Sequence, residues 1–261
     1  DKSNPGLAWH SVGWPLENDT YGGSFLYHLN NNQVAVGYVI GLDYSNPHLS
    51  PFEEFQRFKT HPAVRDVFEG GRRVSYGARA LNEGGFQSVP KLTFPGGCLV
   101  GCTAGFLNVP KIKGTHTAMK SGMIAAEAIF ESLENIQTGY EPKNYAEKLE
   151  DSWLWSELYK VRNIRPGFAK GLFLGLAHAA IDTYLFFGRA PWTLHNHADH
   201  LTLKKASDAQ KIDYPKPDGL ISFDRNSSVF LSGTNHEENQ PPHLTLKNTS
   251  IPINHNLALY D

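Results

Sequence analysis

Paired glycines stand where a flat ligand could reach the main chain. Gly22 and Gly23 directly precede a strand-like, aromatic-rich run. Glycine leaves the backbone bare, so N–H and C=O groups there can hydrogen-bond to a ligand. A tight turn or bulge at the start of a hairpin is the simpler interpretation of the same pair. Gly84 and Gly85 raise the same two interpretations.

The stretch 99–133 has the pattern of a strand, a loop and a long helix, with the strand ending at Gly101. A helix N-terminus leaves N–H groups unpaired and carries partial positive charge, so it suits a phosphate or an electron-rich ring edge. Gly114 would allow close approach, and Thr115 and Thr117 would supply hydroxyl groups. An ordinary Thr-capped helix after a loop is the alternative.

An apolar segment at 168–188 is about long enough to span a bilayer. It contains Lys170, His178 and Asp182, which fall on one side of a helix. Lys or Asp at the centre of a spanning helix costs about 2.5–3.5 kcal/mol. We therefore favour a helix that contacts the membrane surface over one that spans it. A buried core helix with a satisfied His178–Asp182 pair is the alternative.

The histidines and cysteines do not predict a metal site. His195, His197 and His200 lie close together in a polar, loop-like region, but no ligand set with zinc spacing accompanies them. Cys98 and Cys102 are separated by three residues, unlike the two of a redox pair. We expect Cys98 to act as a small buried apolar residue.

Composition limits the classes of function. The chain has 261 residues, 24 Lys and Arg, 26 Asp and Glu, and a formal net charge of −2. Without a basic excess, a protein that coats nucleic acid is excluded. Two cysteines exclude a disulfide scaffold and a four-thiolate cluster built by this chain alone. Residue 1 is Asp with no leader after it, so we expect an internal piece of a longer protein.

The elements that must position these residues are a hairpin and several helices. Runs at 24–29 and 33–40 surround an Asn turn and predict a hairpin. Ser50, Pro51 and Glu53 predict a capped helix start. Further helices are predicted at about 113–133 and 143–160, and short strands at 221–223, 229–231 and 244–246. The first of these helices should bury Ala118, Met119, Gly122, Ala125, Ala126, Ile129 and Leu133.

Several ungapped blocks together resemble one family, that of electron transfer flavoprotein–ubiquinone oxidoreductase. The blocks run over 22–28, 76–88, 90–97, 108–122, 214–219, 232–236 and 240–241. They are long and are spread over essentially the whole chain, so the resemblance is specific.

The resemblance implies a mixed α+β and α/β fold, in which part of a glutathione-reductase-like FAD-binding domain interlocks with a β-sheet ubiquinone-binding domain. A membrane-contacting helical segment would complete it. The implied domains are a ubiquinone-binding region at 1–75, the second half of the FAD-binding domain at 76–135, and a helical region at 136–194 with its membrane segment at 168–188. Residues 195–261 would begin the iron–sulfur domain, with the cluster cysteines expected beyond Asp261.

The resemblance also implies an enzyme. It would be an electron-transferring-flavoprotein dehydrogenase of the mitochondrial inner membrane, on the matrix side. It would accept electrons from reduced electron transfer flavoprotein and pass them to ubiquinone through FAD and a [4Fe-4S] cluster, linking fatty-acid and amino-acid oxidation to respiration. Its partners would be electron transfer flavoprotein, ubiquinone and inner-membrane lipid, without nucleic acid. The isolated piece should be inactive.

Site residues carry over from the resemblance by position, and no protein side chain is expected to be catalytic. Gly22 and Gly23 would hold a ubiquinone carbonyl through the backbone. Thr115 and Thr117 would stabilise charge on the reduced flavin ring. The flavin would be lined by Gly101, Gly105, Phe106, Asn108, Gly114, Thr115 and Thr117. The membrane would be contacted by Phe168, Leu172, Phe173, Leu176, Tyr184 and Phe187.

Two features of the family pattern are missing from these residues. The Gly-rich βαβ unit that holds the ADP half of FAD is absent, as are the cluster cysteines. Two other functions therefore stay open. One is a flavin-dependent geranylgeranyl (isoprenoid) reductase, against which the region 195–261 argues. The other is a non-catalytic membrane-binding module.

Overall fold

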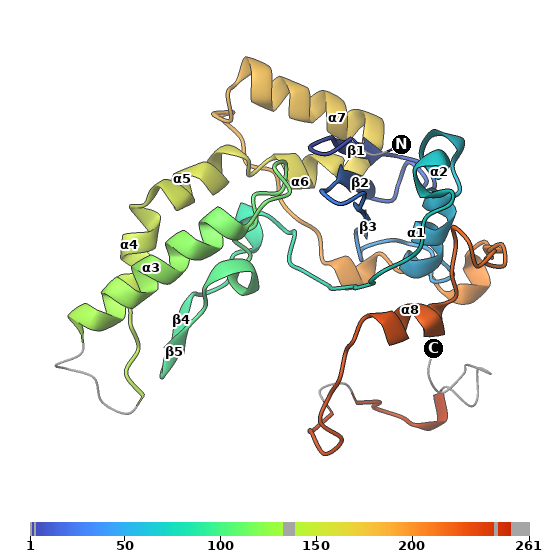
Figure 1. Cartoon of the computed structure of the whole chain (residues 1–261). Coiled ribbons are helices and arrows are strands. Elements are labelled where there is room, and N and C mark those ends of the chain that lie inside the picture. Colours follow the sequence, from blue (N-terminus) through green and yellow to red (C-terminus); the bar gives the residue numbers. More distant parts are fainter. Residues whose placement is uncertain (1, 3, 133–138, 243–244, 252–261) are drawn as a thin grey trace. The chain divides into compact units, whose positions relative to one another are not determined.

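The computed structural model describes residues 2, 4–132, 139–242 and 245–251 (Figure 1). Contacts divide the chain into two units. The first comprises Asp1–Arg72 and Ala78–Asp224, and the second comprises Arg73–Gly77 and Arg225–Asp261. Each unit is described by itself below. The domain boundaries expected from the sequence remain predictions.

A three-stranded antiparallel sheet opens the first unit. Strands β1 (Ala8–Val12), β2 (Gly22–His28) and β3 (Val34–Ile40) lie in the order β1-β2-β3. The predicted hairpin is confirmed, and its turn places Asn31 and Asn32 at positive φ, which Asn tolerates better than most residues. Helices α1 (Pro51–Lys59) and α2 (Pro62–Phe68) cover the sheet through the apolar side chains of Leu26, Phe58 and Val64.

The predicted start of α1 is confirmed in detail. The Ser50 side chain accepts a hydrogen bond from the Glu53 amide, and Pro51 is the first helical residue. Proline suits this position because its missing N–H would have no partner there.

A second core joins a short hairpin to three helices. Strands β4 (Thr93–Phe94) and β5 (Gly97–Cys98) lead into the single turn η2 (Gly101–Ala104). Helices α3 (Thr115–Glu131), α4 (Asn144–Glu150) and α5 (Trp153–Lys160) then pack together. Their core contains Leu92, Ala104, Phe106, Ile124, Ala125, Ala128, Tyr145, Leu149, Leu154 and Leu158.

Two helix predictions for this core are corrected. Helix α3 exists, but Met119, Ala126 and Ile129 are exposed, so the predicted face is only partly buried; Ala125 is buried as predicted, and Leu133 lies outside the described residues. The helix buries its small polar side chains, Thr117 and Ser121, against the preceding loop, which shifts the buried face. The single helix predicted at 143–160 is two helices, because Ser152 adopts an extended backbone between them.

The apolar segment is a series of short helical pieces. Helix α6 (Ile164–Gly167) and turn η4 (Phe168–Lys170) precede α7 (Leu172–Ala180), which continues as the π-turn η5 (Ile181–Leu185). Gly171 and Gly188, both at positive φ, lie on either side of α7 and η5. Among the described residues, no helix is long and apolar enough to cross a membrane.

The second unit contains α8 (Arg225–Leu231), in which Ser227 and Ser228 accept hydrogen bonds from Arg73. The strand predicted at 229–231 is therefore wrong, since these residues continue a helix. In the first unit, no strand forms at 221–223. Of the strand predicted at 244–246, Leu244 lies outside the described residues.

Candidate functional site

The main chain of Gly22, in the central strand β2, lies beyond the end of the neighbouring strand β1. Main-chain groups of successive strand residues point to alternate neighbours. The Tyr21 carbonyl accepts a hydrogen bond from Gly41, beyond the end of β3, so Gly22 points toward β1 and Gly23 toward β3. Strand β1 ends at Val12, which pairs with Gly23. Within the described ranges, no strand residue faces Gly22 on the β1 side, so the backbone there is open to a ligand.

Close approach of the strands also requires glycine at both positions. A Cβ added at Gly22 would lie 2.3 Å from the Val39 carbonyl oxygen and 2.6 Å from Leu16 Cδ1. At Gly23 it would lie 2.3 Å from the Ser11 carbonyl oxygen. Sheet packing therefore accounts for both glycines, whether or not a ligand binds at Gly22.

The apolar segment begins beside this strand. The amide of Leu172, the first residue of α7, lies 3.0 Å from the Asn18 carbonyl oxygen and 3.1 Å from its Oδ1. The rings of Tyr21 and Phe168 meet edge to face, with centroids 5.4 Å apart. Residues predicted to bind quinone and to contact the membrane are thus neighbours.

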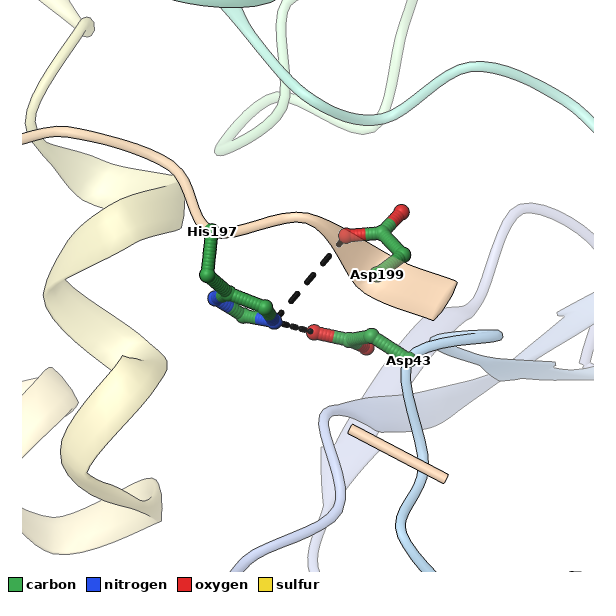
Figure 2. Close-up of side chains that lie close together, drawn as sticks. All are labelled: Asp43, His197 and Asp199. Atoms are coloured by element: carbon green, nitrogen blue, oxygen red, sulfur yellow. Dashed lines mark ion pairs between the residues drawn. The ribbon is translucent and has the colours of Figure 1, made fainter. Parts of the chain in front are cut away.

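A charged network lies next to Tyr21. Asp43 Oδ2 accepts a hydrogen bond from Arg165 Nη2 at 2.9 Å and lies 3.1 Å from His197 Nε2. The Arg165 guanidinium also sits over the Tyr21 ring, 4.3 Å from its centroid. Figure 2 shows His197 between the carboxylates of Asp43 and Asp199, with the Asp199 oxygen 3.9 Å away. Sequence spacing does not reveal this network, because its members come from loops and short helices far apart in the chain.

The three ligand atoms of Asp43, His197 and Asp199 lie within 4.8 Å of one another, which is a spacing a metal ion could use (Figure 2). Arg165, however, already places a positive charge on the same Asp43 oxygen that faces His197. A cation bound there would be repelled by the guanidinium at short range. The geometry therefore favours an ion-pair network over a metal site.

Burial perturbs two titratable groups near the network. Burial raises the pKa of Tyr21 to about 12, and the carboxylates of Glu83 and Asp43 add to this against the opposing charge of Arg165. Burial also raises the pKa of Glu83, and Arg165 offsets part of that rise. Tyr21 therefore stays a neutral hydrogen-bond donor at physiological pH.

The loop before α3 and the start of that helix form an open cradle. In the described part of the chain, no side chain caps α3, so its first N–H groups are unpaired by side chains there. Gly105 adopts φ +84, and a Cβ there would have no atom within 4 Å. Thr115 and Cys102 are exposed beside it. This arrangement can accept the edge of a flat, electron-rich ring.

Three of the predicted flavin-lining side chains are turned into the protein. Thr117 is fully buried, and its hydroxyl lies 2.5 Å from the Phe106 carbonyl oxygen and 2.9 Å from that of Gly114. Asn108, also fully buried, donates from Nδ2 to Glu157 Oε1 at 2.7 Å. Phe106 itself belongs to the core. These residues can shape the cradle without lining it.

Glu157 fastens the cradle to α5. Its Oε1 accepts the hydrogen bond from Asn108 Nδ2. The same oxygen lies 2.7 Å from His116 Nε2 and 3.1 Å from Lys111 Nζ. Burial acts to raise the pKa of Glu157, but these hydrogen bonds and the Lys111 charge outweigh it and lower the pKa to about 2. Sequence spacing does not point to this residue, which lies 49 residues beyond Asn108 of the loop that it holds.

The apolar segment is amphipathic in the structure. Of the three polar residues predicted on one side, Asp182 is buried, His178 is half-buried and Lys170 is exposed, and most of the predicted membrane residues are exposed. Phe168 and Leu172 are the exceptions and pack partly inward, onto Tyr21 and near Gly13. We call the exposed set the apolar patch; it comprises Phe173, Leu174, Leu176, Ile181, Tyr184, Leu185 and Phe187.

The hydrogen-bonded His178–Asp182 pair does not form. Asp182 is 1% exposed, and among the described residues neither of its carboxylate oxygens has a hydrogen-bond partner. The same holds for both ring nitrogens of His178. The π-turn that begins at Ile181 widens the helix between the two residues.

Comparisons with known proteins match the whole chain. Residues 1–81 match a family model described as ETF-QO, ubiquinone-binding, and residues 219–261 match one described as electron transfer flavoprotein-ubiquinone oxidoreductase, 4Fe-4S. The chain is 59% identical over 270 residues to the mitochondrial electron transfer flavoprotein-ubiquinone oxidoreductase of Sus scrofa, covering 100% of this chain and 44% of that protein.

Two further relatives carry the same name. The mitochondrial protein of Homo sapiens is 60% identical over 267 residues, covering 98% of this chain and 43% of its own length. The protein of Pseudomonas aeruginosa is 57% identical over 263 residues, covering 100% and 48%. The chain thus spans somewhat less than half the length of these relatives. The comparisons give no support to an isoprenoid reductase.

Proposed function

The chain belongs along its whole length to the electron transfer flavoprotein-ubiquinone oxidoreductase family, and on this premise we propose that it serves in passing electrons from reduced electron transfer flavoprotein to ubiquinone. Its relatives carry both substrates in their names, and its first 81 residues match a ubiquinone-binding model. The single observation that links the proposal to a residue is the open main chain of Gly22 in β2, next to the point where β1 ends.

The quinone ring would lie against the start of β2. There the Gly22 amide would donate to a ring carbonyl, because among the described residues no strand pairs with it on that side. Gly23 is already paired with β3 and would act through packing. Leu16, which is 7% exposed, and Phe168 would exclude water from the ring. The isoprenoid tail would follow α7, whose first residue is held at Asn18.

The residues present fit one face of FAD. The uncapped start of α3, the open Gly105 and the exposed Thr115 would hold the edge of its ring. Gly101 and Gly114, crowded by Ala118 and Cys102, would let the loop and the helix start pack closely. FAD, when bound, supplies the electron-carrying chemistry. Thr117, Phe106 and Asn108 would position the loop, and the N-terminal N–H groups of α3 would favour negative charge beside them.

The residues present do not fit an iron–sulfur cluster. The stretch 219–261 matches the 4Fe-4S model but contains no cysteine, and the chain has only Cys98 and Cys102. Cysteine ligands of a cluster would have to come from residues outside this chain. FAD and the cluster are therefore assigned by family membership.

We also propose a place for the protein, the matrix side of the mitochondrial inner membrane, which it would contact without spanning. Several relatives are named mitochondrial, and the apolar patch offers a membrane-contacting surface. The patch lies on the segment that is held at Asn18, close in the chain to Gly22. A quinone could then pass from lipid to the strand without crossing water.

The decisive experiment uses the full-length protein that contains this chain. With reduced electron transfer flavoprotein as donor, it should reduce a ubiquinone analogue, and absence of reduction by the folded, cofactor-loaded protein would refute the function. Amide hydrogen exchange tests the site without a substitution. Adding the analogue should slow exchange in a peptide covering 16–24 and leave the hairpin strand 34–40 unchanged. Equal slowing in both, or in neither, would remove Gly22 from the site.

A further inference from the structure

An open pocket lies at the end of the apolar segment, away from the strand and the flavin cradle. Its volume is about 450 Å³. Its walls come from the last turns of α5 and from the chain just after Phe187. The lining residues are Glu150, Trp155, Ser156, Tyr159, Lys160, Arg162, Gly188, Arg189 and Ala190.

The pocket carries an excess of positive charge. Three cations, Lys160, Arg162 and Arg189, line it against one acid, Glu150. Lys160 and Arg189 are exposed and can move toward a ligand, whereas Arg162 is only 2% exposed. A cation held in a poorly hydrated wall acts on a nearby anion more strongly than one surrounded by water.

The buried charge of Arg162 is met by neutral groups. Its guanidinium donates to main-chain carbonyls of Tyr159, Gly188, Ala190 and Trp192, and to the hydroxyl of Thr193. These bonds use its N–H groups but bring no negative charge. Its partners therefore leave a positive field at the pocket that an anion would neutralise.

The position of the pocket indicates where that anion comes from. Gly188 and Arg189 directly follow Phe187, the last residue of the apolar patch, which is 72% exposed. A phospholipid has apolar chains at one end and a phosphate at the other. The apolar patch could contact the chains while the adjacent cationic pocket contacts the phosphate. Trp192, which is 36% exposed, packs edge to face on Phe186. Trp side chains are enriched at membrane–water interfaces.

We propose that this pocket binds the phosphate headgroup of an anionic phospholipid, with Lys160 and Arg189 as the contacting cations and Arg162 as the buried charge behind them. The inference builds on the membrane contact proposed above. It adds a selectivity that an apolar surface alone cannot supply, because apolar contact does not distinguish anionic from neutral lipid.

The test measures binding of the full-length protein to vesicles. One set consists of phosphatidylcholine, and the other of phosphatidylcholine with phosphatidylglycerol. Lys160→Glu/Arg189→Glu should weaken binding to the mixed vesicles by about tenfold or more, since each basic residue near an anionic surface contributes about a factor of five. Binding to phosphatidylcholine alone should stay unchanged.

A matched control is Lys204→Glu/Lys205→Glu, which makes the same change in net charge at two exposed lysines outside the pocket. Equal losses for the two double variants would show that general charge drives binding, and would overturn the proposal. Lys160→Gln/Arg189→Gln gives a second measurement if charge reversal prevents folding, and it should lose less than the Glu variant but more than the control.

Inorganic phosphate separates the two sources of the anion. If the Lys160 and Arg189 substitutions weaken binding of inorganic phosphate while the parent protein shows no preference for mixed over phosphatidylcholine vesicles, the pocket is a site for free phosphate and the headgroup assignment fails. The vesicle assay does not depend on electron transfer. Failure of the quinone assay with intact vesicle selectivity would thus refute the proposed function alone, and the reverse result would refute this inference alone.

Discussion

At the scale of single residues, hydroxyl and amide groups near the flavin cradle act on the backbone. Thr117 bonds the carbonyls of Phe106 and Gly114, and so fixes both sides of the loop that leads into α3. Its expected influence on the flavin would thus pass through the position of the loop. The sequence identified the residue, because a Thr at a helix start suggests a donor, but could not show which way it points.

Thr117→Ala in the FAD-loaded full-length protein should lower the flavin midpoint potential, because the loop and the N–H groups of α3 would be held less firmly beside the negatively charged reduced ring. The potential is measured by redox titration of the flavin absorbance. Thr117→Ser keeps the hydroxyl and should stay close to the parent. A potential unchanged in the Ala variant would exclude Thr117 from tuning the flavin.

At the scale of elements, Glu157 is the point at which α5 holds both the loop and the first turn of α3. Because its folded pKa is about 2, below the ordinary carboxyl value, the ionised form stabilises the fold. This contribution is complete above about pH 4.5 and is lost as pH falls toward 2.

Glu157→Gln should therefore lower the free energy of unfolding at pH 7 by about 1–2 kcal/mol, since water screens part of the interaction. The stability curve between about pH 4.5 and 2 should become flatter, because the group that titrates there is gone. Denaturant unfolding across this range measures both effects. Glu147→Gln, an exposed acid on α4, is the control, and an identical change in it would contradict the assignment to Glu157.

The sequence predicted elements well where local rules decide. Ser50 and Pro51 fix the start of α1, and the Asn turn fixes the register of β2 with β3. The buried face of α3 was missed in part because two of its members, Thr117 and Ser121, are polar side chains that bond to the preceding loop, beside the apolar Ile124, Ala125 and Ala128. Hydrophobic periodicity cannot detect a face of that kind.

The site was predictable only in part, for a related reason. Gly22 and the helix start can be located by motif, but the pairing of Asp43 with Arg165 depends on how distant segments meet. The unpartnered Asp182 is another such case: i, i+4 spacing predicts a bond to His178, and a π-turn prevents it. Tertiary packing decided each of these outcomes.

At the scale of the whole molecule, the apolar patch and the charged pocket divide membrane contact between two kinds of force. Burial of the apolar patch stabilises binding to any lipid, whereas the charged pocket attracts only anionic lipid. Binding to neutral vesicles therefore measures the apolar contribution, and the additional binding to anionic vesicles measures the charge contribution.

Phe173, 74% exposed on α7, tests the apolar part. Phe173→Glu in the full-length protein should weaken binding to phosphatidylcholine vesicles by about tenfold or more, since burying a Phe side chain contributes about 1.5–3 kcal/mol. Vesicle flotation measures this. Phe94→Glu, at an exposed phenylalanine on β4, should bind as the parent does. If both variants bind equally, the patch does not enter the lipid.

The crowding at the start of β2 has a consequence for reading natural variation. Because the carbonyls of Val39 and Ser11 occupy the space of a side chain at Gly22 and Gly23, selection for a foldable sheet alone would keep both glycines through evolution. A paralogue that had lost its quinone would still carry them. Glycine at these positions is thus no fingerprint of the substrate, and the informative place to look for divergence is Leu16 and Phe168, whose side chains the sheet does not dictate.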